Sequence, residues 1–199
     1  MVSDFNLKWN IIHYARKHGI YVPNLFRELF DKAGTVLFRR GEPLKFRQGE
    51  LLCFINYGAV LGELKFENGR KEFHLLMEKH IFYTGLELCG KIKRKTATWT
   101  AVKHSEITYI PLMYLLMAKN EAGTYPNDLF EHIILQDHYA SRVFTQIQNE
   151  TTLENKIKTM LNISPEFLEI KQCHLSDYLM VRPPSLSRSL KEYEEKHLK

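Results

Sequence analysis

The sequence predicts an α+β protein: an N-terminal antiparallel β-roll of the jelly-roll kind, flanked by helices, followed by a long helix and an all-α C-terminal part. Short β-rich segments between turn residues run from Gly34 to Pro111. An uninterrupted helical pattern follows at about residues 126–150, and residues 151–199 show only short helical patterns. Turn signals at the spacing of the first segment are typical of a β-sandwich or barrel.

The composition is that of a globular protein with a mild basic excess. The chain has 199 residues, of which 44% are hydrophobic and 26% are charged, so it has enough apolar residues for a real core. Its net charge of +5 fits nucleic acid or another anionic partner, and also fits proteins with neither. We predict three parts, with boundaries at 1–125, 126–150 and 151–199.

The cysteines and the hydropathy pattern exclude several classes of protein. Cys53, Cys89 and Cys173 are far apart and odd in number, which does not fit a disulfide framework, and no Cys-x-x-Cys pair indicates a metal site. Neither a signal peptide nor an apolar run of about 18 residues is visible. We therefore expect a cytoplasmic protein without membrane contact, metal or cofactor.

The expected elements follow from local patterns. Apolar residues keep a helical period in residues 5–30, and a further helix is expected from Pro111 to Ala118. Asn68–Gly69 is a strong hairpin signal between two β-rich segments. The expected strands are residues 35–38, 51–56, 59–66, 71–77, 96–102 and 106–110.

The helical pattern at 126–150 contains a heptad seam, in which apolar residues step alternately by four and three positions. This spacing is typical of two helices packed side by side. A second apolar flank at Phe130, Ile134 and Phe144 could rest on the β domain, which leaves the seam for a partner chain. The alternative is that the seam packs only within its own chain. We predict a parallel homodimer through Leu129, Ile133, Gln136, Ala140, Val143 and Ile147.

The last 25 residues, Leu175–Lys199, have the pattern of a helix-turn-helix. A first helix should end near Leu179, with Ser176 at the close approach of two helices. A second helix should start at Pro183, because proline suits the first turn of a helix. An ordinary helical hairpin would show the same pattern, since the motif is short.

The second helix of this hairpin would present polar residues outward, while Leu186, Leu190 and Tyr193 face the first helix. A recognition helix meets base edges and phosphates with such a face. We predict DNA contacts from Arg182, Ser185, Ser187, Arg188 and Ser189.

The order of these parts resembles the Crp/Fnr superfamily of bacterial transcription regulators over nearly the whole chain. The resemblance implies a homodimer that binds DNA through Arg188, senses an effector in its β-roll, and has RNA polymerase as a further partner. The resemblance does not imply an enzyme. Segments that look like family motifs are Gly34–Pro43, Phe54–Gly58, Glu67–Arg70 and Ala101–Pro111.

The predicted effector pocket departs from the family pattern. In members that bind cyclic nucleotides, a Gly-Glu pair and an Arg-Ser pair hold the ribose and the phosphate. Gly85 matches, but Leu86 replaces the glutamate unless a one-residue slip lets Glu87 serve. Lys95 and Thr96 stand for Arg-Ser, and a lysine lacks the bidentate fork of arginine. We expect no cyclic nucleotide here. The basic run of Lys91, Lys93, Arg94 and Lys95 could bind another small anion or a peptide-like molecule, or be a solvated loop.

The helix-turn-helix segment also departs from the family, which leaves a second functional hypothesis open. Met180 stands where the family has glycine, Pro183 and Pro184 replace polar residues, and the sequence ends at Lys199, where a β-hairpin wing would begin. The alternative is a relative with impaired DNA binding that acts by binding a small molecule or a protein.

Other chemistries have weaker support. A haem ligand could be proposed at His74, His80 or Cys89, but a lone histidine in a β-roll is more often a packed or surface residue. A cupin-like enzyme needs several closely spaced ligands, and His74, Glu78 and His80 are the nearest approximation.

Overall fold

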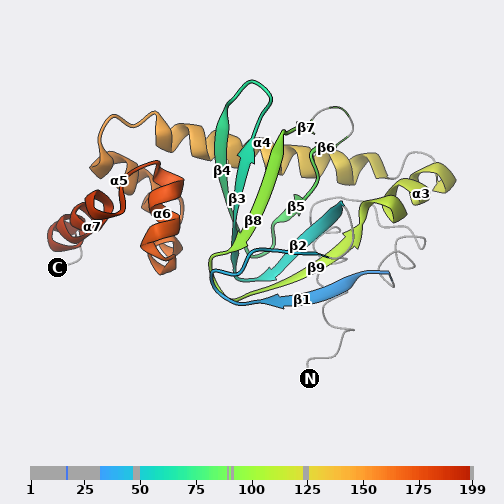
Figure 1. Ribbon diagram of the computed structural model, residues 1–199, viewed down its shortest axis with the longest axis horizontal. Helices are drawn as coiled ribbons and strands as arrows, with labels where there is room; N and C mark the ends of the chain where they lie inside the picture. Colours follow the sequence, from blue (N-terminus) through green and yellow to red (C-terminus); the bar gives the residue numbers. More distant parts are fainter. Residues whose placement is uncertain are drawn as a thin grey trace.

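The computed structural model describes Lys17 and residues 32–46, 50–88, 90, 92–122 and 126–197. Two antiparallel sheets form a β-roll (Figure 1). The first sheet has the strand order β1-β9-β2-β5, with β1 at Gly34–Phe38, β2 at Leu51–Tyr57, β5 at Ile81–Tyr83 and β9 at Ser105–Pro111. The second has the order β4-β3-β8, with β3 at Ala59–Lys65, β4 at Lys71–Met77 and β8 at Thr96–Ala101. A two-stranded ribbon joins β6, Glu87–Leu88, to β7, Ile92–Lys93.

The predicted α+β class and the predicted strands are confirmed, apart from shifts of one or two residues at their ends. The hairpin at Asn68–Gly69 joins β3 and β4, and the N–H of Phe66 donates to the carbonyl of Arg70 at 2.9 Å across it. Gly69 adopts a φ of 82° there, which glycine tolerates without steric cost. The sequence pattern missed β5, β6 and β7, which are too short to show a period. The helices expected at residues 5–30 lie outside the described residues.

Between the two sheets lies a core of tightly buried apolar side chains, among them Cys53, Ile55, Val60, Leu64 and Ile107. Their alternation along each strand follows from the two-residue period of a β-strand, which sends every second side chain inward. Free Cys53 is part of this core, and burial raises the pKa of its thiol well above the usual value, so it behaves as a small apolar residue.

Helix α3, Leu112–Ala122, leaves the roll directly after β9, and helix α4, Pro126–Gln148, returns across one face of it (Figure 1). Helix α4 packs mainly on β4 and β5. The side chain of Gln136 on α4 accepts a hydrogen bond from the backbone N–H of Ile81 at 2.9 Å, which ties the helix to the edge strand β5.

The packing of α4 corrects the predicted dimer seam. Leu129, Ile133, Ala140 and Ile147 are at most 8% exposed within the single chain, and Val143 is packed against the same core as Ile147. With Gln136 bonded to β5, all six residues assigned to the seam face their own chain. The heptad spacing marked a packed face correctly, but the roll and the C-terminal helices occupy that face.

The C-terminal part consists of α5 at Leu153–Ile163, a 3₁₀ turn η1 at Pro165–Glu169, α6 at Gln172–Leu179 and α7 at Pro183–His197. These elements lie together at one end of the roll, beyond the end of α4 (Figure 1). Thr152 caps α5 by accepting a hydrogen bond from the N–H of Asn155. One apolar cluster joins Phe73 and Val102 of the roll, Phe144 of α4 and residues of α5, α6 and α7. The division at residues 126 and 151 stays a prediction, since this core crosses both boundaries.

Candidate DNA-binding surface and effector site

A tight left-handed turn joins α6 to α7 at the place predicted for the turn of a helix-turn-helix. Met180 ends α6 in the left-handed conformation, with φ 55° and ψ 44°, although it is not a glycine. Its N–H donates to the carbonyl of Asp177 at 3.1 Å, and the N–H of Val181 donates to Ser176 at 2.9 Å. Ser176 is 3% exposed, as expected at the close approach of two helices. Helix α7 then begins at Pro183.

Helix α7 presents a polar face outward, because Leu186 and Leu190 are buried against α6 and the rest of the C-terminal core. Arg182, Ser185, Ser187 and Arg188 are exposed, whereas Ser189 is half-buried. The structure therefore brings four of the five predicted DNA contacts to the surface. Lys191 is also exposed, one turn beyond Arg188. Lys191 was not among the predicted contacts, although its spacing of three residues from Arg188 places both on one helix face.

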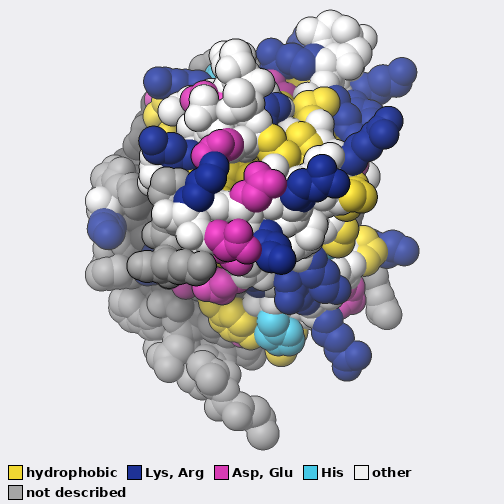
Figure 2. Space-filling model, turned by 90° about the vertical axis from the view of Figure 1, so that its left-hand side faces the viewer, with side chains coloured by type: hydrophobic (Ala, Val, Ile, Leu, Met, Phe, Trp, Pro, Cys, Tyr) yellow, Lys and Arg dark blue, Asp and Glu magenta, His cyan; other side chains and the backbone are white. Residues whose placement is uncertain are grey.

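The outward face of α7 changes its charge along the helix. Arg182 lies just before the helix, and Arg188 and Lys191 lie in it up to its middle. The exposed Glu192, Glu194 and Glu195 follow, together with Lys196, whose charge is paired with Glu154. Basic side chains surround much of this end of the molecule, interrupted by a few acidic ones (Figure 2). Phosphates would therefore be attracted to the first half of α7 and repelled from the second half.

A basic turn of the β-roll lies next to the start of α6. The guanidinium of Arg40 donates to the backbone carbonyl of Glu169 at 3.0 Å, and the ammonium of Lys103 pairs with the Glu169 carboxylate at 2.8 Å. Gly41 of the same turn faces the side chain of Lys171. These contacts hold the C-terminal helices against the roll at a second point, outside the apolar cluster.

The predicted effector residues do not converge. Gly85 is buried, but Glu87, Lys95 and Thr96 are exposed. Glu87 sits opposite Lys93 in the β6-β7 ribbon, where it faces solvent. Adjacent residues of an extended chain point to opposite sides. Exposure of Lys95 therefore goes with burial of its neighbour Arg94, which is 5% exposed.

The space next to Gly85 is filled by two side chains of the same chain. The Tyr83 hydroxyl donates to the Glu50 carboxylate at 2.5 Å and also approaches the backbone carbonyl of Glu87 at 2.9 Å. A Cβ atom at Gly85 would collide with both Tyr83 and Glu50, so the glycine is required by this internal contact. A ligand phosphate at Gly85 would have to displace a carboxylate.

Arg94, which the sequence placed in a general basic run, is buried beside Gly85. Its guanidinium donates to the backbone carbonyls of Tyr83 at 3.2 Å and Gly85 at 3.4 Å. It also forms an ion pair with the carboxylate of Asp137, one helical turn after Ile133 on α4. Burial lowers the pKa of Arg94, but an arginine remains charged at neutral pH. The loop before β8 is thus joined electrostatically to the long helix.

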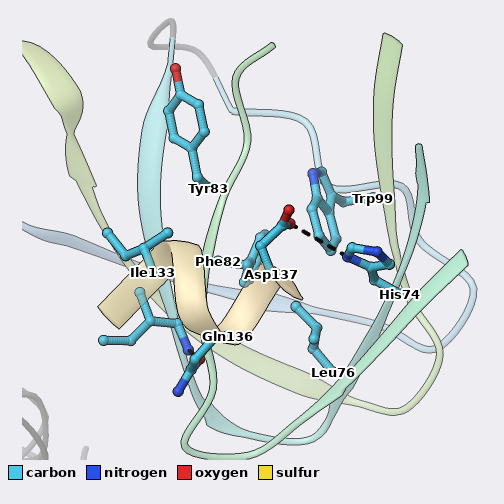
Figure 3. Close-up of a pocket in the computed structure, with 9 residues that line it drawn as sticks. His74, Leu76, Phe82, Tyr83, Trp99, Ile133, Gln136 and Asp137 are labelled. Carbon is cyan, nitrogen blue, oxygen red and sulfur yellow. Dashed lines mark hydrogen bonds and ion pairs between the residues drawn. The ribbon is translucent and has the colours of Figure 1, made fainter. Parts of the chain in front are cut away.

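Asp137 continues this interaction into a buried polar network. Its carboxylate lies 3.5 Å from Nδ1 of His74 (Figure 3). Nε2 of His74 lies 3.0 Å from the Glu72 carboxylate. Ser141 of α4 donates to Glu72 at 2.5 Å, and Arg70 pairs with the other Glu72 oxygen at 2.9 Å. His74 is 1% exposed and Glu72 is 3% exposed, so these charges are compensated mainly by one another.

The pKa values of the network follow from this arrangement. Burial acts to lower the pKa of His74, but hydrogen bonds with Asp137 and Glu72 outweigh burial and raise it. Burial acts to raise the pKa of Asp137, but His74 and Arg94 hold it below its usual value. The pKa of Glu72 is lowered in the same way by His74 and Ser141, against the effect of burial. The network therefore favours a charged His74 between two carboxylates.

A small cavity remains between the roll and α4, lined by His74, Phe82, Tyr83, Trp99 and Asp137 together with Leu76, Ile81, Ile133 and Gln136 (Figure 3). Its volume of about 10 Å³ is near the minimum for one water molecule. Two buried donors near this region, Nε of Arg94 and Nε1 of Trp99, have no hydrogen-bond partner among the described residues. The cavity as it stands does not accommodate a nucleotide.

The other proposed chemistries find no support in the described part of the chain. No group of three histidine, cysteine or acidic side chains in it is arranged to hold a metal ion. His80 bonds to the carbonyl of Met77 at 3.1 Å, and burial lowers its pKa. Ser141, His74 and Asp137 come together as a serine hydrolase would need, but the Ser141 hydroxyl donates to Glu72. The Glu72 oxygen is the nearer acceptor at 2.5 Å, whereas Nε2 of His74 lies 3.3 Å away, so the serine hydroxyl is directed at the carboxylate and not at the histidine.

None of the described helices has the length and apolar character that a bilayer crossing requires.

Comparison with known proteins rests on the fold. No protein-family profile matches the chain, and no curated protein matches it in sequence. A crp/fnr-family putative transcriptional regulator from Eubacterium rectale superposes with a TM-score of 0.67 at 13% identity, over 92% of this chain and 88% of that one. FixK2 from Bradyrhizobium japonicum gives 0.63 at 16% identity, over 82% and 85%. The c-di-GMP-responsive global regulator CLP from Xanthomonas campestris gives 0.59 at 10% identity, over 86% and 91%. The chain therefore has the fold of the Crp/Fnr regulators, as the order of its parts predicted.

Proposed function

We propose that this protein is a DNA-binding transcription regulator of the Crp/Fnr type and not an enzyme. The observation that carries the proposal is the α6–α7 unit: a left-handed turn at Met180, two buried leucines on α7, and Ser185 and Arg188 exposed on its opposite side. A recognition helix needs this division between a packed face and a polar face. The similarity in fold to regulators supports the proposal and does not by itself assign a function.

We propose further that the protein acts as a parallel dimer through α4, using the face opposite the corrected seam. Leu135 is 65% exposed and Tyr139 is 58% exposed in the single chain, although both are large and apolar. With His132, Arg142 and Gln146 they again step by three and four positions. A second copy of α4 would cover these side chains and set the spacing between two recognition helices.

The β-roll is the proposed sensory part, and RNA polymerase is the proposed further partner of a bound dimer. Cyclic nucleotide is not the proposed effector, because Tyr83, Glu50 and Asp137 occupy the positions at Gly85 and Arg94 that its anionic part would need.

The experiment that tests DNA binding is a titration of promoter fragments from the protein's own genome at several salt concentrations. Phosphate contacts should make the affinity fall steeply with salt. Arg188→Ala should weaken specific binding by about 1–3 kcal/mol without changing the melting temperature, because the side chain is exposed. Glu194→Gln, also exposed on α7, is the control: it removes a negative charge and should not weaken binding. Equal binding by wild type and Arg188→Ala would place the recognition surface elsewhere.

The second function, a relative with impaired DNA binding that acts through a small molecule or a protein, is favoured by one observation. The exposed start of α7 carries Pro183 and Pro184, which have no side-chain donors, and three exposed glutamates follow at Glu192, Glu194 and Glu195. Weak binding that does not discriminate between promoter and random DNA would support this alternative.

A further inference from the structure

We propose that Asp137 is a built-in ligand of the β-roll. Its carboxylate occupies, next to Arg94, a site that a small carboxylate or oxyanion would otherwise take, and it thereby holds α4 against the roll without an effector. The proposal deepens the proposed sensory role of the roll, and it concerns a residue that no pattern in the sequence singled out.

The geometry at Arg94 is that of an anion site. Its buried guanidinium is oriented by the carbonyls of Tyr83 and Gly85, which accept from Nη1, while Nη2 donates to Asp137 of α4. Arginine binds carboxylates and phosphates through such a planar set of donors. In this chain the acceptor comes from Asp137, so the site is filled by a side chain from a different element.

Several charged groups face Asp137, and they show why a carboxylate belongs there. Arg94 lies on the roll side and His74 projects from β4, while Glu72 lies on the far side of His74 and Arg70 on the far side of Glu72. His138 adds a weaker positive influence from α4 itself. Removal of Asp137 leaves Arg94 and His74 with Glu72 as their only close buried carboxylate among the described residues. Such uncompensated charge makes the empty site attractive to a small anion.

The Nε of Arg94 is the second observation that points to a ligand. It is buried and has no partner among the described residues, although both terminal nitrogens of the guanidinium form hydrogen bonds. Asp137 therefore satisfies only part of the donor set. A free carboxylate or oxyanion could accept from Nε as well as from the terminal nitrogen that Asp137 binds, in the two-point manner typical of arginine.

The test is chemical rescue in the full-length protein. Asp137→Ala should lower the melting temperature by on the order of 10 °C, because a buried guanidinium loses its counter-charge. Sodium formate or acetate should then raise the melting temperature of this variant by about 3 °C or more above that in sodium chloride of equal ionic strength, since these anions bind the folded state. Wild type and Glu131→Ala, which removes an exposed carboxylate of the same helix, should not distinguish the salts.

Equal responses of Asp137→Ala to carboxylate and chloride would overturn the proposal. If that variant does not fold, Asp137→Asn and Arg94→Gln replace it in a double-mutant cycle. The double variant should be clearly more stable than the sum of the single losses predicts, and additive losses would overturn the proposal.

Cyclic AMP and inorganic phosphate should leave wild-type DNA affinity within about twofold of its value without them. A protein that binds no DNA would refute the proposed function, while the thermal measurements would still decide the role of Asp137.

Discussion

Phe144 of α4 contacts Tyr178 of α6 edge to face, with ring centroids 5.8 Å apart. Phe144 also lies against Phe73 of β4 at 6.1 Å, and Tyr178 lies against Phe167 at 5.6 Å. The backbone carbonyl of Tyr178 accepts a hydrogen bond from Gln148 at 2.8 Å. One aromatic row therefore connects the β-roll, the long helix and the helix-turn-helix. The orientation of α6 relative to the roll is fixed by packing rather than by a flexible linker.

Phe144→Ala should destabilise the protein by about 3–5 kcal/mol, because it removes a side chain that is 5% exposed at the centre of this row. Urea denaturation followed by fluorescence measures the change. The control is Thr145→Ala, whose exposed side chain on the next position of α4 should matter by less than about 0.5 kcal/mol. A loss below about 1 kcal/mol for Phe144→Ala would mean that the C-terminal helices are not held as described.

Met180→Gly should stabilise the protein by about 0.5–1 kcal/mol. Met180 has a φ of 55° and is 57% exposed, so glycine relieves the strain of a left-handed residue at little cost in buried area. Met180→Ala retains the Cβ atom and should give no comparable gain, which makes it the matched control. Thermal melting of the three proteins is sufficient, and a Gly variant that melts at or below wild type would contradict the strained turn.

Leu135→Glu combined with Tyr139→Glu should convert a dimer into monomers. Each change removes apolar burial worth on the order of 1.5–3 kcal/mol per side chain and brings like charges together across a two-fold seam. Sedimentation velocity gives the mass. Thr145→Glu, exposed but outside that face, should leave the dimer intact. If the double variant keeps the wild-type mass, the exposed face of α4 does not form the interface. A wild type that is monomeric at micromolar concentration would refute the dimer itself.

Stability should depend on pH through His74 and its two carboxylates. The pKa of His74 is raised in the folded state, so its contribution is fully present below about pH 6.5 and is lost as the pH rises through the raised value. The pKa values of Asp137 and Glu72 are lowered, so their contribution is present above about pH 4.5 and is lost on acidification. His74→Gln should remove the loss of stability at alkaline pH and leave the loss of stability at acid pH. Urea midpoints from pH 4 to pH 9 test this, and an alkaline loss that persists in His74→Gln would assign it to another group.

The sequence by itself determined the elements whose signals are local. Pro183 marks the start of α7, Asn68 and Gly69 mark the β3-β4 turn, and the spacing of Leu186 and Leu190 marks the packed face of α7. In each case a few neighbouring residues fix the backbone or repeat with the period of the element. The order of these elements was enough to predict the fold.

Only the tertiary structure decided which surface each face would meet. The heptad pattern of α4 is equally compatible with a second chain and with the roll, because periodicity reports that a face is buried and not what buries it. The register of the loop before β8 decides whether Arg94 or Lys95 is buried between the β-roll and α4. A shift of one residue exchanges the inward and outward side chains. The pairing of Arg94 with Asp137, 43 residues apart, arises because α4 crosses the roll at that point, and no local signal records such a long-range contact.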